Sequence, residues 1–244
     1  MPRILAINPN TTPAVTALVE RQLRAAAPAV EWRMATGRFG AAYIVSEAAF
    51  AIASHAAIEA WAHHEAGCDA VLLACFGDPG LFALRELSAA PVAGLAEASM
   101  HAAAQRAERF TIVTGGPRWR PMLERLALAL GFAPKLASVR TVETTGAQAA
   151  AAPDNAVREL ADACRAARDE DGAGAVILGG AGFAGLGERV GDAAGLAVID
   201  SVTAGAHAAQ RLALGAPWPY ACIAARRPMA SAGVDDRLAG KLFD

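Results

Sequence analysis

Residues 71–81 read VLLACFGDPGL, and residues 176–186 read VILGGAGFAGL. The two stretches align without a gap at an offset of 105 positions, the difference between 71 and 176, with glycines and apolar residues in the same register. Self-similarity at a fixed spacing indicates a duplicated structural unit. One position breaks the match, because Cys75 in the first copy corresponds to Gly180 in the second.

The composition is that of an ordinary globular protein, with 55% hydrophobic and 19% charged residues in 244 positions. This length suits one large domain or two of about 100–120 residues each. The formal net charge of −2 gives no electrostatic footprint for nucleic acid or an anionic membrane surface. Asn8 and Pro9 interrupt the first apolar run, so neither a signal peptide nor a membrane span is expected.

Short runs of Val, Ile and Leu alternate with alanine-rich stretches of helical pattern. Such runs are typical of parallel strands covered on both faces. We expect strands at residues 4–7, 71–74, 92–95, 110–113, 176–178 and 196–199, with weaker candidates at 30–34 and 136–142. Helical patterns cover residues 13–26, 46–66, 97–107, 118–130, 154–169 and 203–214, and the alanine run at 149–152 is expected to be a linker or a helix start.

This alternation predicts an α/β fold of two pseudo-symmetric doubly wound units, each with a four-stranded parallel sheet. The first unit is expected to comprise residues 1–97 plus 212–244, and the second residues 98–211. Ligands bind beyond the carboxyl ends of parallel strands. Four predicted strand ends lead into residues 8–12, 75–78, 114–116 and 180–182. If the units face each other across a pseudo-twofold axis, these segments meet in one active-site cleft.

Cys75 is the candidate for chemistry, because it ends a predicted buried strand and precedes a turn in which Pro79 suits the first turn of a helix. A thiol at a helix N-terminus is favoured as the thiolate. The alternative is simple packing, since free cysteine is among the most buried residue types. Without a Cys-x-x-Cys pair, the chain is expected to be a cytoplasmic protein with reduced thiols. Packing roles are expected for Cys68, Cys164 and Cys222.

Two strand-to-helix turns are candidate binding elements. Thr12 is predicted to be an N-cap with Pro13 at the first helical position. Asn10 and the neighbouring amides could also bind an anionic or carbonyl group. In the second unit, the turn at residues 114–116 contains two glycines that permit close approach of a ligand to the backbone.

Residues 180–185 match the dinucleotide pattern Gly-x-Gly-x-x-Gly, and Asp200 follows at the end of another predicted strand. The helix that follows is unusually short, and two of the glycines already mirror glycines of the first unit, so NAD binding is not favoured. Asp200 and Glu97 could reach the cleft, although capping the next helix is the expected role for each.

The histidines do not cluster with cysteines or carboxylates at zinc spacing, so no metal site is predicted. His63 and His64 are expected on a solvated helix face. His55, His101 and His207 are expected to pack within helices.

The segments at residues 8–12, 43–44, 74–80, 92–98 and 178–182 resemble the hydantoin/allantoin racemase branch of the aspartate/glutamate racemase superfamily. The resemblance runs from residue 3 to about residue 215. It implies two pseudo-symmetric α/β domains, a homo-oligomer, a small-molecule substrate and no cofactor. It also implies two cysteines on opposite faces of the substrate, one of which removes the proton α to a carbonyl while the other returns one. The substrate-binding residues expected beside catalytic Cys75 are Asn10, Ile44, Phe76, Gly77, Thr114, Gly115, Gly116, Gly180 and Ala181.

The chain departs from the family pattern at Gly180, where the resemblance would place the second cysteine. Glycine cannot transfer a proton, and three alternatives follow. The chain is a racemase or isomerase in which water or another residue serves the Gly180 face. It is a one-thiol decarboxylase of a malonate-type substrate. Or it has lost activity and binds a small ligand in the cleft.

Overall fold

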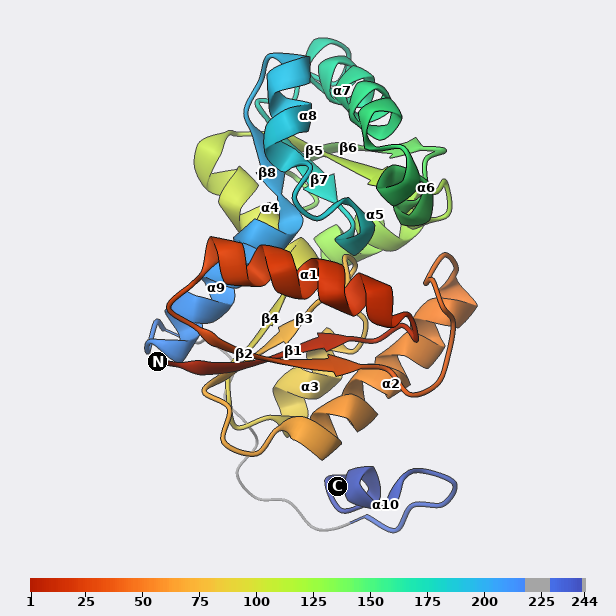
Figure 1. Ribbon diagram of the computed structural model, residues 1–244, viewed down its shortest axis with the longest axis vertical. Coiled ribbons are helices and arrows are strands. Elements are labelled where there is room, and N and C mark those ends of the chain that lie inside the picture. The colour runs from red at the N-terminus through yellow and green to blue at the C-terminus, as the bar shows by residue number, and fades with distance from the viewer. Residues whose placement is uncertain (218–228, 243–244) are drawn as a thin grey trace.

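The computed structural model describes residues 1–217 and 229–242, and Figure 1 shows two α/β units, each built around its own sheet. The first sheet contains β1 (Arg3–Asn8), β2 (Glu31–Thr36), β3 (Ala70–Leu73) and β4 (Val92–Gly94) in the order β2-β1-β3-β4. The second contains β5 (Phe110–Gly115), β6 (Leu136–Val142), β7 (Ala175–Gly179) and β8 (Val198–Asp200) in the order β6-β5-β7-β8. Every pairing among the described strands is parallel. The predicted fold class is confirmed.

The central strands are buried along all or nearly all of their length, which is why they read as continuous apolar runs. All residues of β3 and β7 are buried. The edge strands β2 and β6 are only partly buried and carry charged or hydroxyl residues. The partial exposure of β2 and β6 admits polar residues, and this explains why their sequence signal was weaker.

Helices connect successive strands on the faces of both sheets. The first unit contains α1 (Pro13–Ala26), α2 (Glu47–His64) and α3 (Leu81–Leu87). The second contains α5 (Trp119–Ala129), α6 (Gly146–Ala151), α7 (Pro153–Asp169), a 3-10 turn η1 (Ala181–Phe183) and α8 (Gly187–Ala194). The alanine run at residues 149–152 therefore forms the end of α6, and its last residue, Ala152, is the N-cap of α7. Pro79 lies before α3 and not in its first turn, because the left-handed N-cap Gly80 intervenes.

Two helices cross from one unit to the other. Helix α4 (Leu95–Arg106) follows the last strand of the first sheet yet packs mainly on β7 and β8 of the second. Helix α9 (Ser201–Ala213) follows the last strand of the second sheet yet packs on β3 and β4 of the first. The two helices also pack on each other, at the centre of Figure 1. This reciprocal exchange joins the units through a shared core.

Residues 229–242 lie on the first unit, where α10 (Asp236–Ala239) packs on α2. The domain limits expected at residues 97 and 211 stay a prediction. None of the helices in the described part of the chain is long and apolar enough to span a membrane.

Candidate active site

A cavity of about 260 Å³ lies between the two units, where loops after strands of both sheets meet. Its walls are mostly apolar, and no described residue that lines it carries a charged side chain. The lining residues are Asn10, Val15, Tyr43, Ile44, Val45, Cys75, Phe76, Thr114, Gly115, Gly116, Trp119, Thr145, Gly146, Gly180, Ala181, Gly182 and Phe183. The duplicated topology therefore does create one cleft between the units.

Nine of the ten predicted site residues line this cavity, and Gly77 does not. Gly77 has φ of +111°, and a Cβ there would stand 2.4 Å from Cζ3 of Trp119. The absence of a side chain at Gly77 therefore lets the indole ring of Trp119 pack directly on the backbone. Lining residues that were not predicted as site residues are Val15, Tyr43, Val45, Trp119, Thr145, Gly146, Gly182 and Phe183. Most are apolar or small, and in a sequence such residues cannot be distinguished from core residues.

Cys75 lies just beyond β3 and is only 7% exposed. Burial raises the pKa of its thiol to about 12, and the nearby Asp78 carboxylate adds to the effect. The prediction that a helix N-terminus favours the thiolate was wrong, because α3 begins only at Leu81. In the resting protein Cys75 is therefore a neutral thiol on the cavity wall.

Asp78 holds the loop after Cys75 against the start of α4. Its backbone adopts φ of +56°, and its carboxylate accepts hydrogen bonds from the backbone N–H groups of Ala96 and Glu97, each at 2.9 Å. Burial raises the pKa of Asp78 to about 7 in spite of these donors. The Glu97 side chain forms a buried ion pair with Arg85. Glu97 neither caps α4 with its side chain nor lines the cavity, so both roles expected for it were wrong.

The turn after β1 caps helix α1 and also places the side-chain amide of Asn10 at the cavity. Thr12 is the N-cap of α1 as predicted, although its hydroxyl donates to the backbone carbonyl of Ala42 and not to the helix. Oδ1 of Asn10 accepts hydrogen bonds from Nδ2 of Asn8 and from the backbone N–H of Thr12, both at 2.9 Å. Nδ2 of Asn10 has no hydrogen-bond partner in the described part of the chain. This amide is a donor available to a ligand in the cavity.

Gly180 occupies the wall of the second unit with φ of +131°, a conformation that side chains rarely adopt. A Cβ at this position would stand 3.1 Å from Cδ2 of Phe183 and 3.8 Å from Oγ1 of Thr114. The space beside Gly180 is therefore bounded by an aromatic ring and a hydroxyl. Thr114 itself is 3% exposed.

The dinucleotide pattern at residues 180–185 does not form a nucleotide-binding turn. Its glycines lead into η1, and α8 begins only at Gly187. Asp200 caps α9 by accepting from the backbone N–H groups of Val202 and Thr203, as expected, and also accepts from that of Gly185. Asp200, the acidic residue of the pattern, is thus already engaged in hydrogen bonds to backbone N–H groups.

Two further cysteines, Cys68 and Cys164, lie outside the cavity lining. Cys164 is buried within α7, where burial raises the pKa of its thiol to about 12. Cys68 is partly buried after α2, with Nη1 of Arg33 3.6 Å from its sulfur. Both positions agree with the expected packing roles. Cys222 lies outside the described residues.

The histidines agree with expectation only in part, since His101 and His207 are exposed despite the packing roles expected for them. His55 and His101 make edge contacts with phenylalanine rings, at 4.9 Å between centroids in each case, and His64 is exposed. His207 lies 3.1 Å from the carbonyl oxygen of Ala26. The prediction for His63 was wrong, because it groups with two carboxylates and is only 18% exposed in its side chain.

Comparison with known proteins identifies the fold family. Residues 4–209 match the Asp/Glu/Hydantoin racemase family. A hydantoin racemase from Paenarthrobacter aurescens is 38% identical over 225 residues, which cover 87% of this chain and 92% of that protein. Allantoin racemase from Pseudomonas fluorescens has a TM-score of 0.88 at 30% identity, covering 95% of this chain and 100% of that chain. An arylmalonate decarboxylase with a TM-score of 0.59 at 21% identity, over 90% of this chain and 96% of that chain, shares the fold alone.

These similarities confirm the prediction of an isomerase of the racemase type. They agree with the internal duplication, the two parallel sheets and the cleft between them. The chain belongs to the Asp/Glu/Hydantoin racemase family.

Proposed function

We propose that this protein racemises a neutral ring substrate whose acidic carbon lies beside a carbonyl, a 5-substituted hydantoin, without a cofactor. The observation that carries the proposal is that Cys75 and Gly180, equivalent positions of the two repeats, line the same cavity. A site with a proton-transfer group on one wall and no side chain on the other suits exchange at a planar carbon between them.

The lining supports a neutral substrate with an apolar substituent. Tyr43, Phe76, Trp119 and Phe183 contribute aromatic surface, and no charged side chain among the described lining residues could balance a substrate carboxylate or ammonium. Burying an unpaired charge in such surroundings is costly. This favours a hydantoin over a free amino acid, and an aromatic or aliphatic 5-substituent over a polar one.

Removal of a carbon-bound proton requires donors for the enolate oxygen that develops on the carbonyl. Nδ2 of Asn10 is one such donor on the wall of the first unit. In the second unit, the turn at Thr114, Gly115 and Gly116 exposes backbone to the cavity. We assign the carbonyl of the substrate to this region, between the two strand-end turns.

Each proton transfer is assigned to a group on one of the two walls of the cavity. Solvent hydroxide first takes the proton of the neutral Cys75 thiol and becomes water. The resulting Cys75 thiolate takes the proton from the substrate carbon, and the electron pair of the C–H bond moves onto the carbonyl oxygen. A water molecule beside Gly180 and the Thr114 hydroxyl then gives a proton to the opposite face of that carbon, and the carbonyl re-forms. The resulting hydroxide takes the proton from the Cys75 sulfur through solvent, which regenerates the Cys75 thiolate and the water molecule. In the reverse direction the Cys75 thiol is the acid.

One-thiol decarboxylation is the second candidate, because the high pKa of Cys75 keeps a proton ready for delivery to an enolate. A malonate substrate, however, brings two carboxylates into a cavity whose described lining offers no cationic side chain. The charge of the substrate therefore favours racemisation.

The test is hydrogen exchange at C5 of single-enantiomer 5-benzylhydantoin in deuterated buffer, followed together with loss of optical rotation. We expect deuterium incorporation with racemisation above the spontaneous rate, and a loss of at least about 100-fold in Cys75→Ser. Cys164→Ser, another buried thiol, should leave the rate unchanged. Exchange that persists in Cys75→Ser, or that is absent from hydantoins while phenylmalonate releases carbon dioxide, would overturn the proposal.

Gly180 offers a second test of the proton path. Gly180→Cys places a thiol on the bare wall and should raise the racemisation rate, whereas Gly180→Ala introduces the same backbone strain without an acid. A φ of +131° makes both variants less stable by about 1–3 kcal/mol. Rates are therefore compared between these two variants at a temperature at which both are folded. Equal rates would contradict a proton-transfer role for this wall.

A further inference from the structure

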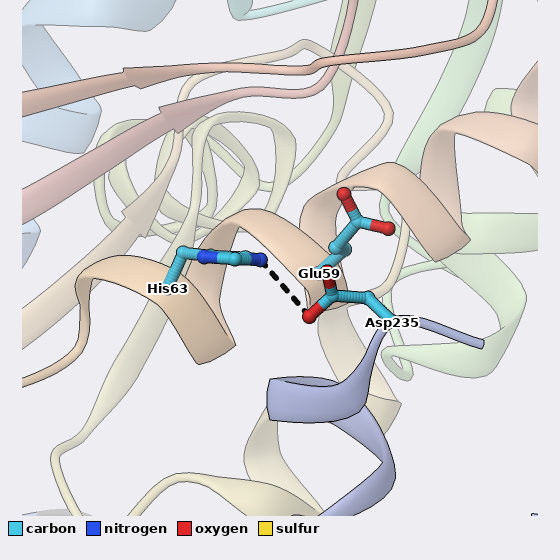
Figure 2. Close-up of side chains that lie close together, drawn as sticks. All are labelled: Glu59, His63 and Asp235. Carbon is cyan, nitrogen blue, oxygen red and sulfur yellow. Dashed lines mark ion pairs between the residues drawn. The ribbon is translucent and has the colours of Figure 1, made fainter.

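A second cluster of side chains that could bind a ligand lies between α2 and the start of α10, away from the lining of the cavity. Glu59, His63 and Asp235 bring one imidazole and two carboxylates together (Figure 2). One potential ligand atom from each residue lies within 4.8 Å of the other two. Nε2 of His63 is 3.0 Å from Oδ1 of Asp235. Their separation is short enough for both atoms to contact one small cation.

The fold explains why these three residues meet. Glu59 and His63 are four residues apart on α2 and so share one helix face. Asp235 is the N-cap of α10 and accepts a hydrogen bond of 3.0 Å from the backbone N–H of Arg237. Leu238, buried in the core cluster that contains Trp61, holds the same segment against α2. Asp235, the third potential ligand, is thus positioned by an independent contact.

A cationic side chain, that of Arg38, already lies within the cluster. The Arg38 guanidinium is 3.1 Å from Oε1 of Glu59, 3.6 Å from Oδ2 of Asp235 and 3.2 Å from Nε2 of His63. Nε2 of His63 therefore faces both an arginine donor and a carboxylate acceptor, and it cannot satisfy both with one protonation state. A cation that accepts the nitrogen lone pair would satisfy the imidazole and both carboxylates together.

We propose that a divalent transition-metal ion, with Zn²⁺ as the best match, binds to Glu59, His63 and Asp235 in place of the Arg38 guanidinium. One imidazole nitrogen and two carboxylate oxygens suit zinc, and a fourth position stays open to water. Mg²⁺ should bind much more weakly, because it prefers oxygen ligands and holds its own waters. The Arg38 side chain is 60% exposed, so its ion pairs are weak and the side chain can swing into solvent.

The site joins two distant parts of the chain. A metal ion held by α2 and by the N-cap of α10 would fasten residues 229–242 to the first unit. It would add to the ion pair of 2.5 Å between Lys241 and Glu65. Because the ligands come together only in the folded protein, the metal should stabilise the fold.

The test is calorimetric titration of the full chain with ZnCl₂, paired with thermal unfolding at several zinc concentrations. We expect one site per chain and a rise in unfolding temperature with zinc. His63→Asn should weaken binding by at least about tenfold. His64→Asn, at the adjacent exposed histidine, should bind zinc as the parent does. Arg38→Gln should bind about fivefold more tightly, because it removes the competing cation.

Each variant is first checked for folding by its unfolding curve without metal, and Asp235→Asn replaces His63→Asn if the latter does not fold. Three results would overturn the proposal. The first is the absence of saturable binding to the parent chain, which would leave the cluster as an ion-pair network with Arg38. The second is undiminished binding in His63→Asn or Asp235→Asn. The third is an equal loss in His64→Asn, which would place zinc elsewhere.

Discussion

The ring of Phe76, in the first unit, packs on the backbone of Gly179 in the second, where a Cβ would stand 2.3 Å from its Cε1. Gly77 makes the converse contact with Trp119. Each unit therefore presents bare backbone to an aromatic ring of the other, and both rings line the cavity. These two contacts determine how closely the cavity walls of the two units approach each other.

Gly179→Ala should push the Phe76 ring into the cavity and lower the free energy of unfolding by about 1–3 kcal/mol, the usual cost of overpacking. In a Phe76→Ala background the same change should cost much less, because the ring that it strikes is gone. Urea unfolding of the four proteins in this cycle measures the coupling. Gly240→Ala, where the nearest atoms to a Cβ are 3.7 Å away, is the matched control. An equal penalty in both backgrounds would show that Phe76 is not the obstacle.

The protonation state of Cys75 gives a second prediction. Its pKa in the folded protein is about 12, against an ordinary value of 9.0. Between these pH values the unfolded chain has lost the thiol proton while the folded chain keeps it, so stability falls as pH rises through this window. The resulting loss in the free energy of unfolding amounts to about 4 kcal/mol once the pH has risen through the whole window.

Cys75→Ala should remove this alkaline decline, which unfolding measurements at pH 8, 9 and 10 would show as a flatter slope than that of the parent. Alkylation by iodoacetamide at pH 8 should be slow at Cys75, because about a thousandfold less thiolate is present than for an ordinary thiol. Rapid alkylation at pH 8, or an unchanged slope in Cys75→Ala, would mean that the thiol ionises as in water.

Much of the architecture could be predicted because it depends on local pattern. The Val/Ile/Leu runs gave the central strands, and the 105-residue offset indicated two units with a cleft between them. The cleft residues that follow strands were found for the same reason. Trp119 and Phe183 were not predicted as cleft residues, because each is positioned by a contact with a glycine that is distant in the sequence. No pattern along the chain records such a contact.

Two errors had a different origin. The charge state of Cys75 depends on burial and on Asp78, and a motif cannot report the depth of a thiol. The grouping of His63 with Asp235 joins α2 to a segment more than 170 positions later in the chain. Sequence spacing shows Glu59 and His63 on one helix face, but only the docking of α10 supplies the third member.

Asp78 and Asp171 provide a final prediction in which two carboxyl groups respond to pH in opposite directions. Burial raises the pKa of Asp78 to about 7. Hydrogen bonds from the Arg140 guanidinium, together with the Ser138 hydroxyl, hold the pKa of Asp171 below its usual value of 3.8. The folded state therefore disfavours the charge on the first group and favours it on the second.

For Asp78, the folded protein retains a proton that the unfolded chain releases between pH 3.8 and about 7, so its stabilising contribution is lost as pH rises through that window. The stability of Asp78→Asn should consequently improve relative to the parent from pH 4 to pH 7, by up to about 4 kcal/mol. For Asp171 the contribution is present above 3.8 and is lost on acidification, so Asp171→Asn should be destabilised at pH 7 and approach the parent at low pH. Urea unfolding of the three proteins at pH 2, 3, 4, 5, 6 and 7 compares the slopes on both sides of pH 3.8. Parallel slopes for the two variants would show that the buried Asp78 carboxyl is ionised as readily as the paired one. In that case its two backbone N–H donors would outweigh burial, and it would present a full negative charge to the Cys75 sulfur throughout this range.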